Sequence, residues 1–411
     1  MISEIQIENF KSIAKLSLKP GRVTVLIGEN GSGKSNILEA IAFAAAASAG
    51  KLDDEFLYNR GIRVTDEEWM RSAFVPEKNK TAEPPQLWMN SPITVRVFGD
   101  AARKPLGINI RRDISGRDQW STVVEVDEDD IRHAELNHEY SRDDFTEIRS
   151  FLAGASGSEC QLDELAHSIA AKRSAMRKRI EAAPEIAAQM TLKDFLIYSP
   201  ENTVLRTFSS EGAIKPLGPK GEGLLKLLQT SAVLGNGKFT NELKESLALL
   251  GWFGDVWLPT GLDEMQGRLA LRDRWLSDTT PRFDQRSANE GFLYLLFYFT
   301  LFLSPQTPRF FAIDNLDNAL NPKLCAELMR QLAVLAEKSG KQVICTTHNP
   351  AILDGLNLQD DMQRLYVVRR NSEGHTVVNR VSPPRPRPDG ATTRLSAAFM
   401  SGMLGGLPEH F

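Results

Sequence analysis

Residues 28–35 read Gly-Glu-Asn-Gly-Ser-Gly-Lys-Ser, a glycine-rich run with the composition of a phosphate-binding loop. In such a loop the glycines let successive backbone N–H groups surround a phosphate group. The Lys34 ammonium is expected to reach the β- and γ-phosphates of a nucleotide, and the Ser35 hydroxyl is expected to bind Mg²⁺. The loop positions assigned to this cradle are Asn30, Gly31 and Gly33.

The segments on either side of residues 28–35 have the pattern that this loop requires. Residues 22–27 follow a Pro-Gly turn and are short and β-branched, which predicts a strand. From Ser35 onward, helical spacing and many alanines predict a helix, whose N-terminus would direct its positive dipole end at the phosphate. The alternative, a chance glycine-rich turn, is disfavoured by this strand-loop-helix context.

Two later segments end in polar side chains that would complete such a site. Residues 309–313 predict a buried strand that ends at Asp314, a carboxylate for the water shell of Mg²⁺. Residues 342–347 predict another apolar strand, which ends at His348. In a parallel sheet these strand ends share the carboxyl edge where ligands bind. We therefore favour His348 as a sensor of the γ-phosphate over a purely structural histidine.

A second candidate anion site precedes the apolar run of residues 292–303. This run is too short to cross a bilayer and predicts a buried helix. Residues 287–291 (Ser-Ala-Asn-Glu-Gly) stand where this helix would begin, and helix N-termini bind anions.

The order of these motifs resembles the ABC-type ATPase heads of the SMC, RecF and OLD group, and it looks closest to stand-alone AAA-family ATPases of bacterial anti-phage defence. The matching motifs are residues 7–12 (Ile-Glu-Asn-Phe-Lys-Ser), 28–35, 289–291 (Asn-Glu-Gly), 313–322 (Ile-Asp-Asn-Leu-Asp-Asn-Ala-Leu-Asn-Pro) and 346–350 (Thr-Thr-His-Asn-Pro). The resemblance covers nearly the whole chain except residues 141–190.

This resemblance implies ATP and Mg²⁺ as cofactors and a homodimer or higher oligomer as the working form. In such heads the signature segment of one subunit caps the nucleotide held by the phosphate loop of the other. The resemblance assigns Asn289, Glu290 and Gly291 to that signature, without its usual Leu-Ser, and Lys11 to the phosphates of the nucleotide. The glutamine that normally links the two lobes has no assigned counterpart.

One position departs from the resemblance. Related heads carry a glutamate after the aspartate to polarise the attacking water, whereas this chain has Asn315, with Asp317 two residues later. An amide cannot accept a proton, and a positioned general base contributes about 10²- to 10⁴-fold to a rate. Either hydrolysis is slow, or Asp317 or His348 serves as the base. A third alternative, a site that is already inactive, is disfavoured because the other phosphate-handling residues are intact.

The expected fold is α/β: a P-loop ABC-type ATPase head with an attached antiparallel β lobe and a short helical insertion. Strand-like patterns at residues 5–7, 14–18, 93–98, 107–111 and 120–126 predict the lobe, and residues 53–85 read as a long polar loop. The expected parts are residues 1–140 (phosphate loop and β lobe), 141–191 (helical insertion) and 192–411 (signature, Asp314 strand and His348 strand).

Two helical stretches have open interpretations. Residues 162–180 place apolar side chains on one face and crowd basic ones over 172–179, which we read as a solvated face rather than a DNA contact. Residues 395–404 predict a last helix, with Phe399, Met400 and Met403 on one face. We expect this helix to complete the head rather than to dock a partner.

Composition adds limits on function and location. The net charge of −4 and pI of about 6.0 provide no global electrostatic reason to bind nucleic acid or a membrane. Three separated cysteines indicate a reducing compartment, and the opening residues lack a signal-peptide pattern, so we expect a cytoplasmic protein.

No nuclease constellation is visible, and the residues after His348 are too few for a TOPRIM domain. We therefore expect a slow ATPase that acts as a nucleotide-gated sensor or scaffold for a separate effector, a nuclease or toxin, in anti-phage defence. The alternatives are a RecF-like DNA-binding ATPase of repair and a structural subunit that does not hydrolyse ATP. Effector, trigger and oligomer size are not readable from the sequence.

Overall fold

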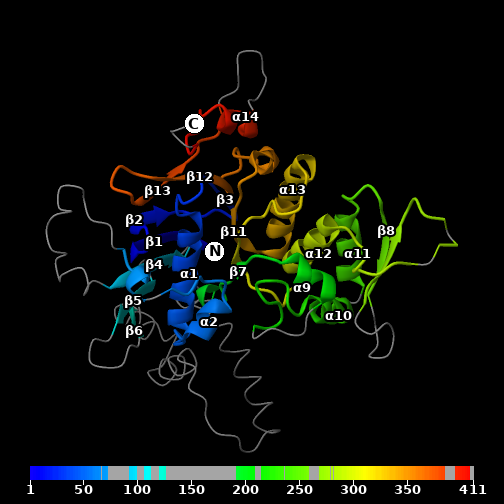
Figure 1. Ribbon diagram of the computed structural model, residues 1–411, viewed down its shortest axis with the longest axis horizontal. Helices are drawn as coiled ribbons and strands as arrows, with labels where there is room; N and C mark the ends of the chain where they lie inside the picture. Colours follow the sequence, from blue (N-terminus) through cyan, green and yellow to red (C-terminus); the bar gives the residue numbers. More distant parts are fainter. Residues whose placement is uncertain are drawn as a thin grey trace, which may run out of the picture.

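The computed structural model describes residues 1–65, 67–72, 92–99, 106–112, 120–125, 191–208, 214–235, 237–258, 268–277, 279–280, 282–384 and 394–407 of the 411-residue chain. These residues form two sheets, a separate two-stranded hairpin and the helices that pack on them (Figure 1). The basic run 172–179 and the rest of the expected helical insertion lie outside the described residues. In the described part, no helix is both long and apolar enough to cross a bilayer.

The central sheet has the strand order β13-β12-β3-β11-β10-β7. Neighbouring strands from β12 to β7 are parallel, and only β13 is antiparallel. Every residue of β3, β10 and β11 is buried, as expected for parallel strands covered on both faces. The strand bounds are Val23–Ile27 (β3), Ile197–Tyr198 (β7), Phe310–Ile313 (β10), Gln342–Thr346 (β11), Gln363–Arg370 (β12) and Thr376–Arg380 (β13).

The second sheet is the antiparallel β lobe predicted from the sequence, with the order β2-β1-β4-β5-β6. Its register sets Ile5 opposite both Leu18 and Val97, so alternate apolar side chains line one buried face. The strand bounds are Ile2–Phe10 (β1), Ile13–Leu18 (β2), Ile93–Gly99 (β4), Leu106–Arg112 (β5) and Trp120–Glu125 (β6).

Helix α1 (Lys34–Ser48) lies between the two sheets (Figure 1). Its side chains from Ile37 to Ser48 are all buried, and they share one hydrophobic cluster with the lobe strands and with Leu26 and Ile344 of the central sheet. Alanine fills positions 44–47, where a small side chain lets both layers approach the helix. The segment after the phosphate loop is therefore helical, as predicted, and is covered on all sides.

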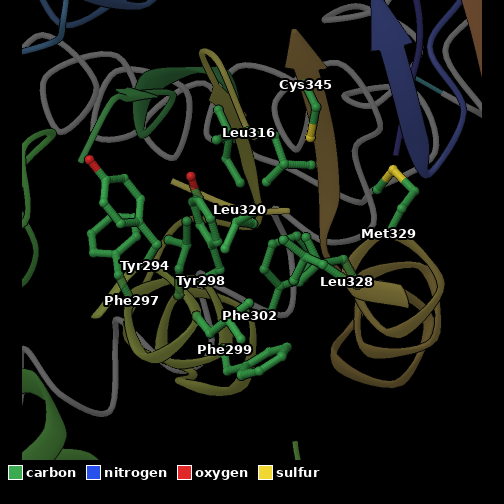
Figure 2. Packing of buried hydrophobic residues seen from close by; sticks show 14 of the residues in the cluster. Tyr294, Phe297, Tyr298, Phe299, Phe302, Leu316, Leu320, Leu328, Met329 and Cys345 are labelled. Atoms are coloured by element: carbon green, nitrogen blue, oxygen red, sulfur yellow. The ribbon is translucent and has the colours of Figure 1, made fainter. Parts of the chain in front are cut away.

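The opposite face of the central sheet carries a second cluster built around α12 (Glu290–Leu303), which has no exposed face between Phe292 and Phe302. Figure 2 shows Tyr298 of α12 beside Leu316 and Leu320 of the turn after β10. The helices around it are α9 (Asn202–Thr207), α10 (Leu224–Leu234), α11 (Lys238–Leu247) and α13 (Pro322–Ser339). The buried helix predicted from residues 292–303 is confirmed.

Two expectations about local structure were wrong, and two hairpins were not predicted. Residues 53–72 are not a plain loop: they contain α2 (Asp54–Tyr58) and α3 (Glu67–Met70), and the Asp53 carboxylate caps α2 by accepting from the Phe56 N–H at 2.9 Å. The hairpins β8–β9 (Phe253–Trp257, Ala270–Asp273) and β12–β13 were not predicted. The last helix, α14 (Leu395–Met400), is shorter than predicted. It buries Phe399, but Met400 and Met403 are exposed. A 3-10 helix, η2 (Pro350–Gly355), follows the His348 strand.

Candidate nucleotide site

The phosphate loop runs from Gly28 to Gly33, between the end of β3 and the start of α1. Gly31 and Gly33 adopt φ angles of 79° and 105°, in the left-handed region that favours glycine. At Gly33 a side chain is also excluded by space, because a Cβ there would lie 2.1 Å from Oγ1 of Thr376. The loop therefore needs glycine at position 33 for two independent reasons.

The side chain of Lys34 folds back along this loop. Its Nζ donates to the carbonyl oxygens of Gly28 and Glu29 at 2.8 and 2.9 Å, and the side chain is almost fully buried. Burial lowers the pKa of Lys34, while the nearby Asp314 and Glu29 carboxylates oppose that shift. The ammonium is thus held within the loop, where a bound phosphate would lie in its reach.

The hydroxyl of Ser32, in the middle of the loop, supplies a test of whether the loop fits a nucleotide. It is fully buried, and its Oγ has no hydrogen-bond partner among the described residues. A buried hydroxyl left unpaired is unfavourable by about 1–3 kcal/mol. Together with the exposed residues Asn30 and Gly31 at the loop tip, it fits a ligand with acceptor oxygens.

Ser35 and Asp314 meet at the edge of the sheet. The Ser35 Oγ lies 3.2 Å from Oδ2 of Asp314, and Thr346 donates its hydroxyl to Oδ1 of the same carboxylate. A hydroxyl and a carboxylate oxygen are the hard ligands that Mg²⁺ prefers, with water completing its octahedral shell. These two residues come from α1 and the end of β10, 279 positions apart in the chain.

Asn315 follows Asp314 in a left-handed backbone conformation, with φ of 55°. Asparagine tolerates this region better than most residues. Its backbone N–H donates to Oγ1 of Thr346 at 2.9 Å, which ties the start of the turn to β11. Asn315 thus carries its carboxamide on the residue that directly follows Asp314, the candidate Mg²⁺ ligand.

The carboxylate of Asp317 points back to the His348 strand. Its Oδ1 accepts from the hydroxyl of Thr347 at 2.7 Å and from the backbone N–H of His348 at 3.2 Å. These bonds join the turn after β10 to the end of β11. Asp317 therefore holds the backbone on which His348 sits.

The imidazole of His348 is exposed at the end of β11. Partial burial and then the positive charge of Lys34 lower the pKa of His348, against opposing effects of Asp317 and Asp314. The ring is therefore neutral at physiological pH, with one nitrogen free to accept a proton or a hydrogen bond.

The three signature residues open on a different surface. Asn289 caps α12 by accepting from the Phe292 N–H at 2.8 Å, and the carboxylate of Glu290 accepts from the side chain of Asn202. Together with Gly291, these residues line a groove of about 1400 Å³ that contains no residue of the phosphate loop. The chain thus brings together Lys34, Ser35, Asp314, Asn315, Asp317 and His348, and it presents Asn289, Glu290 and Gly291 elsewhere.

Lys11 lies in an ion-pair cluster beside α1. Its Nζ is 2.6 Å from Oε2 of Glu39, a buried carboxylate that also accepts from Nε of Arg63 at 2.5 Å. Arg63 in turn donates to the Oδ1 of Asn36 at 3.1 Å. The contact between Lys11 and a phosphate, implied by resemblance, stays a prediction.

Sequence reasoning missed the β12–β13 hairpin, which holds the phosphate loop from outside. Arg370 Nε donates to the Gly31 carbonyl at 2.9 Å, and Thr376 Oγ1 donates to the Ser32 carbonyl at 2.9 Å. The Asn-Ser-Glu-Gly turn of residues 371–374, set between two apolar runs, is the signal that could have predicted this hairpin.

The segment after β7 was also missed as part of the site. β7 is parallel to β10, and the N–H of Asp314 donates to the carbonyl of Tyr198 at 2.8 Å. Residues 199–202 therefore leave the sheet at the same edge as Asp314, and Asn202 reaches Glu290 of the signature segment. This segment links the two surfaces within one chain.

Two family models match separate parts of the chain. A model described as "AAA ATPase domain" matches residues 1–197, and one described as "AAA domain, putative AbiEii toxin, Type IV TA system" matches residues 278–354. The first match contains the phosphate loop, and the second contains the signature segment and both later strand ends.

Curated relatives match over short stretches. The chain is 42% identical over 69 residues to the chromosome partition protein Smc of Methanococcus voltae, which is 15% of this chain and 6% of that protein. It is 42% identical over 55 residues to the DNA replication and repair protein RecF of Bacillus thuringiensis, which is 13% of this chain and 15% of RecF. The matches thus span a small fraction of these relatives.

A solved structure matches over nearly the whole chain. It is an Smc head, described as bound to the C-winged helix domain of ScpA, and it aligns with a TM-score of 0.53 at 15% identity, covering 93% of this chain and 98% of that one. At this identity the likeness concerns the fold. The matched families are ATPases, which bind ATP and usually Mg²⁺. Together with the order of strands and the phosphate loop, these matches support an ABC-type ATPase head of the SMC and RecF group.

Proposed function

We propose that this head binds ATP with Mg²⁺ between two copies of the chain, hydrolyses it slowly, and acts as a nucleotide-gated switch for a separate effector in anti-phage defence. The observation that carries this proposal is Asn315. It stands directly after Asp314, in a site whose other phosphate-handling residues are present and in mutual contact.

In this proposal Lys34 and the N–H groups of the phosphate loop bind the β- and γ-phosphates, and Ser35 and Asp314 hold Mg²⁺. The metal neutralises charge on the phosphate oxygens. Thr346 orients Asp314 by donating to Oδ1, so the second oxygen faces Ser35. These contacts account for tight binding and do not by themselves remove a proton from water.

Removal of a proton from the attacking water is the step for which this chain has no carboxylate at position 315. The Asn315 carboxamide accepts a hydrogen bond and can position a water molecule, but it cannot take a proton. Asp317 is already engaged at Oδ1 by Thr347 and His348, which favours a positioning role. The neutral His348 ring is the remaining group able to accept a proton. Slow turnover is the expected consequence.

The two-copy arrangement is supported by Gly291. A Cβ at this position would meet its nearest atoms at 3.6 Å, an ordinary contact, so the chain's own packing does not require glycine there. Gly291 stands at the N-terminus of a 14-residue helix that faces a groove separate from the phosphate loop. Close approach of a phosphate held by a second copy accounts for both features.

The effector and the defence role are proposed from the second family model. The family model over residues 278–354 has the words "AbiEii toxin" and "Type IV TA system" in its description, which associates this type of head with toxin systems. We further propose the division into residues 1–140, 141–191 and 192–411, and a cytoplasmic location.

The sandwich is tested by light scattering with ATP and Mg²⁺. Wild-type protein should increase in mass with ATP, and Lys34→Ala should not. Gly291→Ala should fold normally, since a Cβ at this position makes only ordinary contacts within the chain, yet assemble less well. Nucleotide-driven assembly of Gly291→Ala equal to that of wild type would contradict the two-copy site.

The switch is tested by steady-state phosphate release beside a phage-plating assay on the same proteins. We expect slow release by wild type and none by Asp314→Ala, because that variant holds Mg²⁺ loosely. Protection against phage should be lost in Asp314→Ala and Lys34→Ala. Full protection by both variants would show that the defence role does not require ATP binding at this site.

A further inference from the structure

The hairpin of β8 and β9 extends from the side of the molecule opposite the β lobe (Figure 1). Residues 282–284 run beside β9, where Leu271 and Phe283 exchange two backbone hydrogen bonds of 2.7 and 3.1 Å. Nothing in the nucleotide site uses this hairpin. Its side chains nevertheless combine two kinds of group that recognise a ligand.

The first kind is an exposed aromatic ring with a cation on it. Trp275, in the turn after β9, is 75% exposed, and the guanidinium of Arg274 lies 4.8 Å from its ring centroid. On the hairpin itself the guanidinium of Arg282 lies 3.6 Å from the ring centroid of Trp257. An arginine on one face of an indole leaves the other face and edge for a further planar group.

The second kind is clustered positive charge. Trp257 pairs with Ala270, so it shares a face with Arg272, two residues along β9. Arg282 stacks on that same tryptophan, and Arg274 follows at the end of β9. We call Trp257, Arg272, Arg274, Trp275 and Arg282 the hairpin patch.

Among the described acidic side chains near the hairpin patch, Asp255 and Asp284 are ion-paired, and Asp273 accepts a hydrogen bond from the Trp275 N–H at 2.9 Å. Asp255, opposite Arg272, lies 2.7 Å from Nζ of Lys244. Asp284 accepts from Arg286 at 2.8 Å and lies 3.6 Å from Arg268. In the part of the chain that the structure describes, Arg274 and Arg282 have no carboxylate partner. The hairpin patch is therefore cationic in a chain whose net charge is −4.

We propose that the hairpin patch binds single-stranded nucleic acid, with phosphates on its arginines and an unpaired base stacked on Trp275. An anionic ligand suits the charge, and a planar ligand suits the open ring face; a single strand offers both. A duplex hides its base faces, and an acidic peptide offers charge alone. This inference does not depend on the proposed function, because binding of a strand at the hairpin patch requires no ATP at the phosphate loop.

The hairpin is also packed against the start of the signature helix. The rings of Trp252 and Phe253, at the base of β8, lie 5.8 and 6.2 Å from that of Phe292 in α12. Gln285 accepts from the Leu269 N–H at 2.9 Å and fixes the chain between the patch and Asn289. A strand bound at the patch would thus lie on the same rigid unit as the signature segment.

Fluorescence anisotropy of the full chain with a labelled oligothymidylate of about 16 nucleotides tests this proposal. We expect binding that weakens as salt rises, and weaker binding of a duplex of equal length. Trp275→Ala should weaken binding by about 5- to 150-fold, the loss of one stacked base, and Trp275→Phe should restore most of it. Arg274→Glu with Arg282→Glu should weaken binding further and flatten the salt dependence.

Two matched controls accompany these variants. Trp69→Ala removes a similarly exposed tryptophan, 66% accessible, from α3, and Lys51→Glu reverses an exposed charge outside the hairpin; both should bind as wild type does. Unchanged thermal unfolding verifies that each variant is folded. The proposal is overturned if the chain does not bind the oligomer, if Trp275→Ala binds it equally well, if the duplex is preferred, or if polyglutamate displaces it at equal charge.

Discussion

Replacing Asn315 by a carboxylate tests the central feature of the nucleotide site. A positioned general base contributes about 10²- to 10⁴-fold to a rate, or roughly 3–5 kcal/mol of barrier. Asn315→Asp keeps the shape of the side chain, but it replaces the amide by a negatively charged carboxylate that can accept a proton. Asn315→Glu adds the reach that related heads have, and we expect it to raise ATP turnover the most.

The backbone conformation at position 315 determines how much each substitution lowers the free energy of unfolding. Position 315 has φ of 55°, which asparagine and aspartate tolerate but which is unfavourable by about 1–2 kcal/mol for other residues with a side chain. Asn315→Glu should therefore lower the free energy of unfolding by about 1 kcal/mol, while Asn315→Asp leaves it nearly unchanged. The expected lowering of the activation barrier, roughly 3–5 kcal/mol, is larger than this loss of folding stability. The rate assay and an unfolding assay measure the two effects separately.

The assay is steady-state phosphate release, with ATP affinity measured in parallel. We also expect the faster variant to protect less well in phage plating, since faster hydrolysis shortens the ATP-bound state. Unchanged turnover in both variants, with ATP binding retained, would refute the reasoning. Rapid wild-type turnover that collapses in Asp317→Asn would instead identify Asp317 as the base.

Three further outcomes are expected. Gly33→Ala should lose ATP binding, measured with a fluorescent ATP analogue, at least tenfold more than Gly31→Ala, because only position 33 combines a left-handed φ with a clash at Thr376. Lys341 donates to the carbonyls of Leu301 and Ser304, and burial lowers its pKa to about 7 from 10.5. The unfolded chain then binds more protons between pH 7 and 10, so stability should rise with pH there by up to about 1.4 kcal/mol per unit. In Lys341→Met, denaturant unfolding at pH 7.5 and 9 should show that this rise has disappeared.

Local signals in the sequence were sufficient to predict the main structural elements of the candidate nucleotide site. The glycine spacing, the β-branched strand before it and the alanine-rich helix after it predicted the phosphate loop, because each depends on neighbouring residues alone. The apolar strands ending at Asp314 and His348 were predicted for the same reason. Their meeting at one sheet edge follows from parallel pairing, and the structure has β3, β11 and β10 side by side.

The β8–β9 hairpin could not be predicted from local sequence patterns. Its strands have five and four residues, with Gly254 and Asp255 in the first, so the apolar alternation is too brief to stand out. The short helices α2 and α3 were missed for a similar reason, since a few residues cannot establish a helical period.

Only the tertiary structure decided how the site is held. Gly33 is required by Thr376, a residue more than 340 positions away, and Asp317 is engaged by the strand end that carries His348. Lys11 pairs with Glu39 across two elements of different layers. Residue type and spacing determine which groups a chain can offer to a nucleotide. Which of those groups are already bound to each other depends on contacts between distant segments, and no local pattern encodes them.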